Sequence, residues 1–88
     1  MKVVKSNGKI EEFSLSKLVG SLLGTFQIAQ KPEGSSNDLI RLTVKKFHTW
    51  ASDKAEITSK DIWIQITKIL EELDPEAAYI YKNFKNII

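Results

Sequence analysis

The chain has 88 residues and a mass of 10.0 kDa, which allows one small domain but hardly a core together with a deep, self-contained active site. Its hydrophobic fraction of 42% and charged fraction of 27% are those of a folded globular domain and disfavour disorder. A net charge of +2 is too weak for a sequence-independent nucleic-acid binder. The absence of cysteine excludes disulfides and thiol chemistry, and the single histidine, His48, leaves no usual zinc ligand set and is expected at the surface.

The sequence shows no sign of a membrane span or a leader. No apolar run approaches the roughly 20 residues that a membrane-spanning helix needs. The first residues, M-K-V-V-K-S-N-G, lack the apolar region of a secretory signal peptide. We therefore expect a cytoplasmic protein without a membrane partner, and the initial Met1 favours a complete small protein.

Residues 2–13 predict a β-hairpin, because an Asn-Gly pair separates two short β-prone runs. Gly8 can take the positive φ that either a two-residue or a three-residue loop requires. A three-residue loop pairs Val4 with Ile10. A two-residue loop pairs Lys5 with Ile10 instead, so the register decides which charges share a face.

Amphipathic spacing predicts four helices after the hairpin, over about 14–30, 36–51, 59–73 and 75–86. Their predicted start signals are, in chain order, Ser14, then Ser36 or Asn37, the capping box T-S-K-D at 58–61, and Asp74 followed by Pro75. We therefore predict one domain over 1–88 of mainly α class with a small β-hairpin (α+β), in which the N-terminal hairpin packs on a four-helix bundle.

The motifs of common catalysts are missing. The four glycines complete neither a P-loop nor a dinucleotide fingerprint, and no G-x-S-x-G sequence occurs. Glu71 and Glu72 are adjacent acids near Asp74 and Glu76, a pattern that favours a solvated face over an acid-base pair. We therefore expect no enzymatic activity.

Two further features invite both a structural and a functional interpretation. Gly20 and Gly24 each cost a helix about 1 kcal/mol relative to alanine, which favours close packing within the bundle or, alternatively, a contact between protomers. Trp63 follows Ile62 by about 100° around its helix. We predict a partly exposed indole, which serves either peripheral core packing or as a wall for a planar ligand.

Lys5 and Lys17 lie on the predicted hairpin and on the helix that follows it. Another predicted helix begins with the hydroxyl residues Thr58 and Ser59. Ammonium groups near a helix N-terminus suit an anionic ligand. Spacing alone indicates such a site only weakly, because lysines are common on protein surfaces.

Residues 3–18 read V-V-K-S-N-G-K-I-E-E-F-S-L-S-K-L, and further matches follow at 57–62 (I-T-S-K-D-I) and 78–81 (A-Y-I-Y). The first of these resembles the opening of the ATP-cone family, commonly written V-x-K-R-[DN]-G-x-x-E-x-F-[DNS]-x-x-K-[IL]. The resemblance implies a short β-hairpin over a four-helix bundle. It also implies a non-catalytic regulatory domain that senses ATP against dATP, as in ribonucleotide reductases, the bacterial repressor of their genes and some archaeal kinases.

The resemblance implies roles for nine residues. Lys5 and Lys17 match lysines that contact phosphates, whereas Ser6 stands where the family usually has a phosphate-binding arginine. Glu11 matches the acid that reads the adenine amino group. The remaining matches are Ser14 beside the adenine, Leu18 near the base, Ser59 at the phosphates, and Ile62 and Trp63 along the ribose and base.

Two departures from the family pattern bear on affinity. The missing arginine at Ser6 weakens triphosphate binding, and the sequence ends before a late basic phosphate contact that Lys82 or Lys85 could replace. The resemblance implies ATP or dATP as ligand and leaves open whether Mg²⁺ accompanies it. The implied partner is a second copy of the chain or a larger enzyme or regulator, with nucleotide-dependent association.

Two alternatives follow from the same residues. A helical protein-interaction module could keep this fold after losing nucleotide binding, an alternative that Ser6 supports. A small nucleic-acid-binding protein could use Arg41, Lys45 and Lys46, but it would need a basic stripe, and the modest net charge argues against one.

Overall fold

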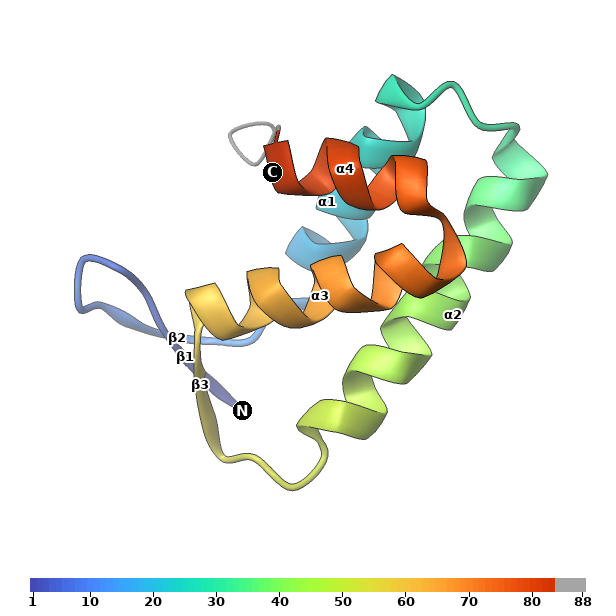
Figure 1. Cartoon of the computed structure of the whole chain (residues 1–88). Helices are drawn as coiled ribbons and strands as arrows, with labels where there is room; N and C mark the ends of the chain where they lie inside the picture. Colours follow the sequence, from blue (N-terminus) through green and yellow to red (C-terminus); the bar gives the residue numbers. More distant parts are fainter. Residues whose placement is uncertain (84–88) are drawn as a thin grey trace.

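A computed structural model describes residues 1–83 of the chain as four helices with a small sheet. The elements are β1 (Lys2–Val4), β2 (Ile10–Glu12), α1 (Leu15–Ile28), α2 (Glu33–Ala51), β3 (Glu56–Thr58), α3 (Ser59–Leu73) and α4 (Pro75–Asn83). This confirms the predicted α+β class. In Figure 1, α4 turns back along α3, α2 crosses beside them, and the sheet lies at the beginning of α3. Within the described residues, no helix has the length and apolar character needed to cross a membrane.

The sheet has three strands in the order β2-β1-β3, with β1 antiparallel to β2 and parallel to β3. The hairpin of β1 and β2 was predicted, whereas β3 was not, because its place depends on pairing with β1, which is distant in the sequence. Val3 of the central strand and Ile57 of β3 are both buried, which anchors the sheet on the helices.

The hairpin has the three-residue loop. The Lys5 N–H donates to the Lys9 carbonyl at 2.8 Å, the Gly8 N–H donates to the Lys5 carbonyl at 2.9 Å, and Gly8 has a φ of 85°. Val3 lies opposite Glu11 in the register, so Val3, Lys5 and Glu11 share one face. Because Val3 is buried, this face is the one turned towards the helices.

Helix α1 begins where the sequence predicts. The Ser14 hydroxyl accepts a hydrogen bond from the Lys17 N–H at 3.3 Å, which caps the helix. Leu18, Leu22 and Phe26 follow at intervals of four residues and are buried. The helix ends at Ile28, two residues before the predicted limit.

Helix α2 begins at Glu33, so the predicted start at 36 with a Ser36 or Asn37 cap is wrong. Pro32 occupies the cap position, and the Ser36 N–H already donates to the Pro32 carbonyl at 2.9 Å in a helical i to i−4 bond. The Ser36 hydroxyl donates to the same carbonyl at 3.0 Å instead of capping. The preset φ of Pro32 therefore starts the helix earlier than the polar residues suggested.

The capping box of α3 is confirmed. The Asp61 N–H donates to Thr58 Oγ1 and the Thr58 N–H donates to Asp61 Oδ2, each at 3.0 Å. Asp74 caps α4 as predicted, since its Oδ1 accepts from the Ala77 N–H at 3.3 Å. The predicted last turn of α4, at 84–86, lies outside the described residues.

Replacing the α3 cap should have a moderate effect on stability. We expect Thr58→Ala to lower the free energy of unfolding by about 1 kcal/mol, because the Asp61 N–H loses its partner. Thr49→Ala is the matched control, since Thr49 is exposed within α2 and its hydroxyl donates only to the Lys45 carbonyl. Urea denaturation measures both variants, and equal losses would contradict a special role for the cap.

The core lies between the four helices and reaches the sheet through an aromatic contact. Leu22, Phe47, Ile66 and Leu70 are each 0% exposed. Phe13, between β2 and α1, stacks on Phe47 of α2 with ring centroids 5.4 Å apart. This stack fixes the end of the hairpin, and so the start of α1, against α2.

Candidate functional site

The described residues form an open cavity of about 910 Å³ between the sheet, the start of α1, the start of α3 and α4. Its volume is in the range of small-molecule sites. All nine residues that the sequence analysis assigned to a site line this cavity: Lys5, Ser6, Glu11, Ser14, Lys17, Leu18, Ser59, Ile62 and Trp63. The fold therefore brings together residues that are up to 58 positions apart in the sequence.

Two lysines and one carboxylate form a cluster at the sheet side of the cavity. The Lys5 Nζ lies 3.5 Å from Glu11 Oε2, and the Lys17 Nζ lies 3.6 Å from the same oxygen. The charges of Lys17 and then Lys5 lower the pKa of Glu11, so this carboxyl is ionised at neutral pH. Ser14 adjoins the cluster, because its hydroxyl caps the turn that carries Lys17.

The beginning of α3 presents backbone donors to the cavity. The first four N–H groups of a helix have no partner within it. The capping box satisfies those of Thr58 and Asp61, and the other two belong to Ser59 and Lys60, which both line the cavity. The positive end of the helix dipole adds to the charge of Lys60, so this wall favours an anionic group.

The cavity is mainly apolar where α1, α3 and α4 meet. Leu18 is buried, and Ile62 and Trp63 are half-buried, as expected for a tryptophan at the cavity edge. Ser21 and Tyr81 lie deeper, at 5% and 4% exposed. Burial raises the pKa of Tyr81 to about 12, so this side chain remains a neutral phenol. The cavity thus has an apolar side with two hydroxyl groups.

Gly20 differs from its predicted role. A Cβ added at this position would meet no atom within 4 Å, so close helix packing is not what the glycine permits. Gly20 is exposed and lines the cavity, where the missing side chain leaves space.

The structure adds a lysine that the sequence analysis did not single out. Lys60 lines the cavity, whereas Lys82 does not, and Lys85 lies outside the described residues. In the sequence Lys60 stands beside Ser59, within both the capping box and the family match at 57–62, and neither pattern assigned it to the site. Lys60 therefore supplies a third positive charge to the cavity, at the beginning of α3.

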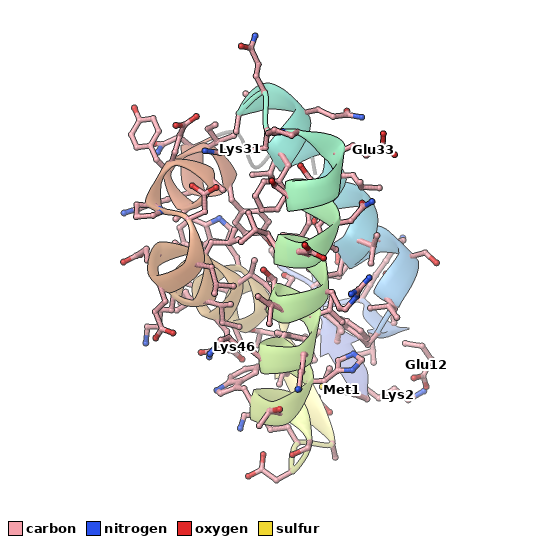
Figure 2. All side chains as sticks on the ribbon, turned by 90° about the vertical axis from the view of Figure 1, so that its right-hand side faces the viewer. Met1, Lys2, Glu12, Lys31, Glu33 and Lys46 are labelled. Atoms are coloured by element: carbon pink, nitrogen blue, oxygen red, sulfur yellow. The ribbon has the colours of Figure 1, made fainter. Side chains whose placement is uncertain are left out.

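The basic residues of α2 form a different surface. Lys45 and Lys46 line a second cavity of about 570 Å³ with Trp50 and part of α3, and Figure 2 shows Lys46 apart from Lys2 and Glu12 at the sheet. The Lys46 Nζ lies 4.0 Å from a carboxylate oxygen of Glu72, which is exposed as predicted. The Lys54 Nζ lies 4.5 Å from the centre of the Trp50 ring and covers it. This arrangement does not favour base stacking by Trp50.

Models of known protein families give no match to the sequence, and a search of curated proteins gives none either. Across residues 1–83, no group of three or more His, Asp or Glu side chains is placed to hold a metal ion.

Proposed function

We propose that this protein is a regulatory adenine-nucleotide-binding domain of the ATP-cone type. One observation carries the proposal: the nine residues that stand at the family's binding positions, eight of them matching and Ser6 departing, converge on a single cavity of suitable volume. That cavity also has a charged wall and an apolar wall, the division that a nucleotide requires.

In this proposal the phosphates bind at the charged wall. Lys5, Lys17 and Lys60 provide ammonium groups, and the N–H groups of Ser59 and Lys60 provide backbone donors. Lys60 stands in for the arginine that is missing at Ser6. Three lysines make the site suitable for a nucleoside di- or triphosphate.

The base would lie against the apolar wall formed by Leu18, Ile62 and Trp63. Glu11 accepts a hydrogen bond from the adenine amino group. Guanine has a carbonyl oxygen at the equivalent position, and a carboxylate without a donor facing it loses the free energy of that hydrogen bond.

The proposed role is allosteric rather than catalytic. A bound nucleotide controls a protein only if it binds two states of that protein with different affinities. We propose that ATP or dATP shifts the association of this domain with a second copy or with a larger enzyme related to ribonucleotide reductase. Light scattering with and without nucleotide measures association with a second copy. A molar mass that does not change with nucleotide would exclude this form of association.

Intrinsic fluorescence tests nucleotide binding. We expect ATP, dATP and AMP to change the tryptophan emission and GTP to leave it unchanged, because Trp63 lines the cavity. Trp63→Phe retains Trp50 as the only tryptophan and should abolish the change. If calorimetry also shows no ATP binding, the protein-interaction module without a nucleotide becomes the better interpretation.

Lys60→Ala tests the proposed phosphate contact of Lys60, which only the structure indicated, separately from those of Lys5 and Lys17, which the sequence predicted. We expect the variant to bind ATP about tenfold more weakly, the low end for a charge-assisted hydrogen bond, because the side chain is exposed. Lys60→Arg should retain most of the affinity. Lys68→Ala is the control, since Lys68 is an exposed lysine of α3 outside the cavity. Calorimetric titration with ATP measures all three, and equal affinities of the two alanine variants would exclude Lys60 from the site.

A further inference from the structure

The arrangement of the lysine–glutamate cluster conflicts with the arrangement that a bound nucleotide needs. Lys5 and Lys17 both contact Oε2 of Glu11, at 3.5 and 3.6 Å. In an adenine nucleotide the amino group and the phosphates lie at opposite ends of the molecule. The two lysines therefore cannot hold the phosphates while Glu11 holds the amino group and all three remain in contact. The side chains are 42%, 72% and 40% exposed, so a ligand can reach each of them.

We infer that Glu11 is an internal counter-ion that occupies the anion position of the cavity and must be displaced by the ligand. This inference rests on the proposed function and adds a selection step to it. Binding exchanges two lysine–carboxylate contacts for lysine–phosphate contacts and releases the Glu11 carboxylate. The released carboxylate then needs a new hydrogen-bond donor, and the adenine amino group is one.

The exchange defines the class of ligand. A suitable ligand carries both an anionic group for the lysines and an N–H donor for Glu11, as an adenine nucleotide does. Inorganic triphosphate supplies the anion alone and leaves Glu11 as a nearby like charge. Inosine triphosphate supplies the anion and directs a carbonyl oxygen at the carboxylate. Glu11 therefore lowers the binding affinity of both of these ligands relative to that of ATP.

Glu11→Gln should change the affinities for different ligands in different directions. Glutamine keeps the size of the side chain but removes the negative charge between the lysines. We expect inorganic triphosphate to bind about fivefold more tightly, which is the factor for one unit charge near 4 Å in a water-like environment. The preference for ATP over inosine triphosphate should fall about tenfold. If Glu11 had only a structural role, Glu11→Gln would instead lower the affinities for all the ligands together.

Calorimetric titration of the whole chain with sodium triphosphate, ATP and inosine triphosphate tests the inference. Glu56→Gln is the matched control, because Glu56 is an exposed glutamate of the same sheet outside the cavity and its replacement changes the net charge equally. Circular dichroism checks that both variants fold, as expected for substitutions of solvent-accessible carboxylates.

The outcomes separate the inference from the proposed function. Tighter triphosphate binding by Glu11→Gln, with no gain for Glu56→Gln, supports the counter-ion role. Unchanged or weaker triphosphate binding by Glu11→Gln overturns it, even if wild-type protein binds ATP. If wild-type protein binds no ATP while Glu11→Gln gains triphosphate affinity, the counter-ion role stands and the proposed adenine recognition fails.

Discussion

Phe47→Ala should lower the free energy of unfolding by about 3–5 kcal/mol, the usual range for removing a fully buried phenylalanine. The Phe47 side chain is 0% exposed and packs against three aromatic rings. Its ring centroid lies 5.4 Å from that of Phe13, 5.7 Å from that of Trp50 and 6.3 Å from that of His48. Since a small domain has a total stability of roughly 5–15 kcal/mol, this single substitution removes a large share of it.

Urea denaturation measures the effect, with Phe47→Leu as the control that keeps most of the apolar volume and should cost clearly less. The substitution should also weaken ATP binding where the protein remains folded, because Phe13 loses the ring that fixes the hairpin end near Glu11. A loss below about 1 kcal/mol for Phe47→Ala would show that this contact does not hold the sheet to the helices.

The double variant Lys5→Ala/Lys17→Ala should bind ATP about a hundredfold more weakly than the wild-type protein. Each lysine is expected to contribute about tenfold through a charge-assisted contact with phosphate, the low end of the range because both side chains are partly exposed. The melting temperature should change little, since exposed ion pairs add little to stability.

Lys9→Ala/Lys68→Ala is the matched control for this experiment. It removes the same two charges from exposed positions outside the cavity. Calorimetry should show ATP affinity close to wild type for this control. Equal ATP affinities of the two double variants would mean that phosphate binding depends on total charge, and the assignment of Lys5 and Lys17 would be wrong.

The features that the sequence predicted well depend on short-range signals. An Asn-Gly pair indicates the hairpin, although only the structure decides for the loop that brings Val4 opposite Ile10, and the T-S-K-D sequence at 58–61 contains both partners of a capping box. Strand β3 could not be predicted, because its place is determined by pairing with β1, more than fifty residues away. The start of α2 was misjudged because Pro32 was interpreted as part of a loop, although it occupies the cap position of the helix.

The residues of the candidate site were likewise predicted where the signal is local and missed where only the fold brings them together. The residues on the hairpin and the start of α1 were found because the family resemblance is concentrated there. Ser21, Lys60 and Tyr81 were not found, because they come from three helices and only the fold places them on one cavity. Gly20 was predicted to permit either close packing within the bundle or a contact between protomers, and the sequence could not show that its face is open to the cavity.

The most direct test is a nuclear magnetic resonance titration of the isotopically labelled chain with ATP. We expect the backbone amide signals of residues 5, 11, 14, 17 and 59–63 to shift, because these residues line the proposed site or adjoin its α3 wall. The signals of Lys45, Lys46 and Trp50 in the second cavity should remain in place. Shifts concentrated on that second cavity, or no shifts at millimolar ATP, would contradict nucleotide binding between the sheet and the helices.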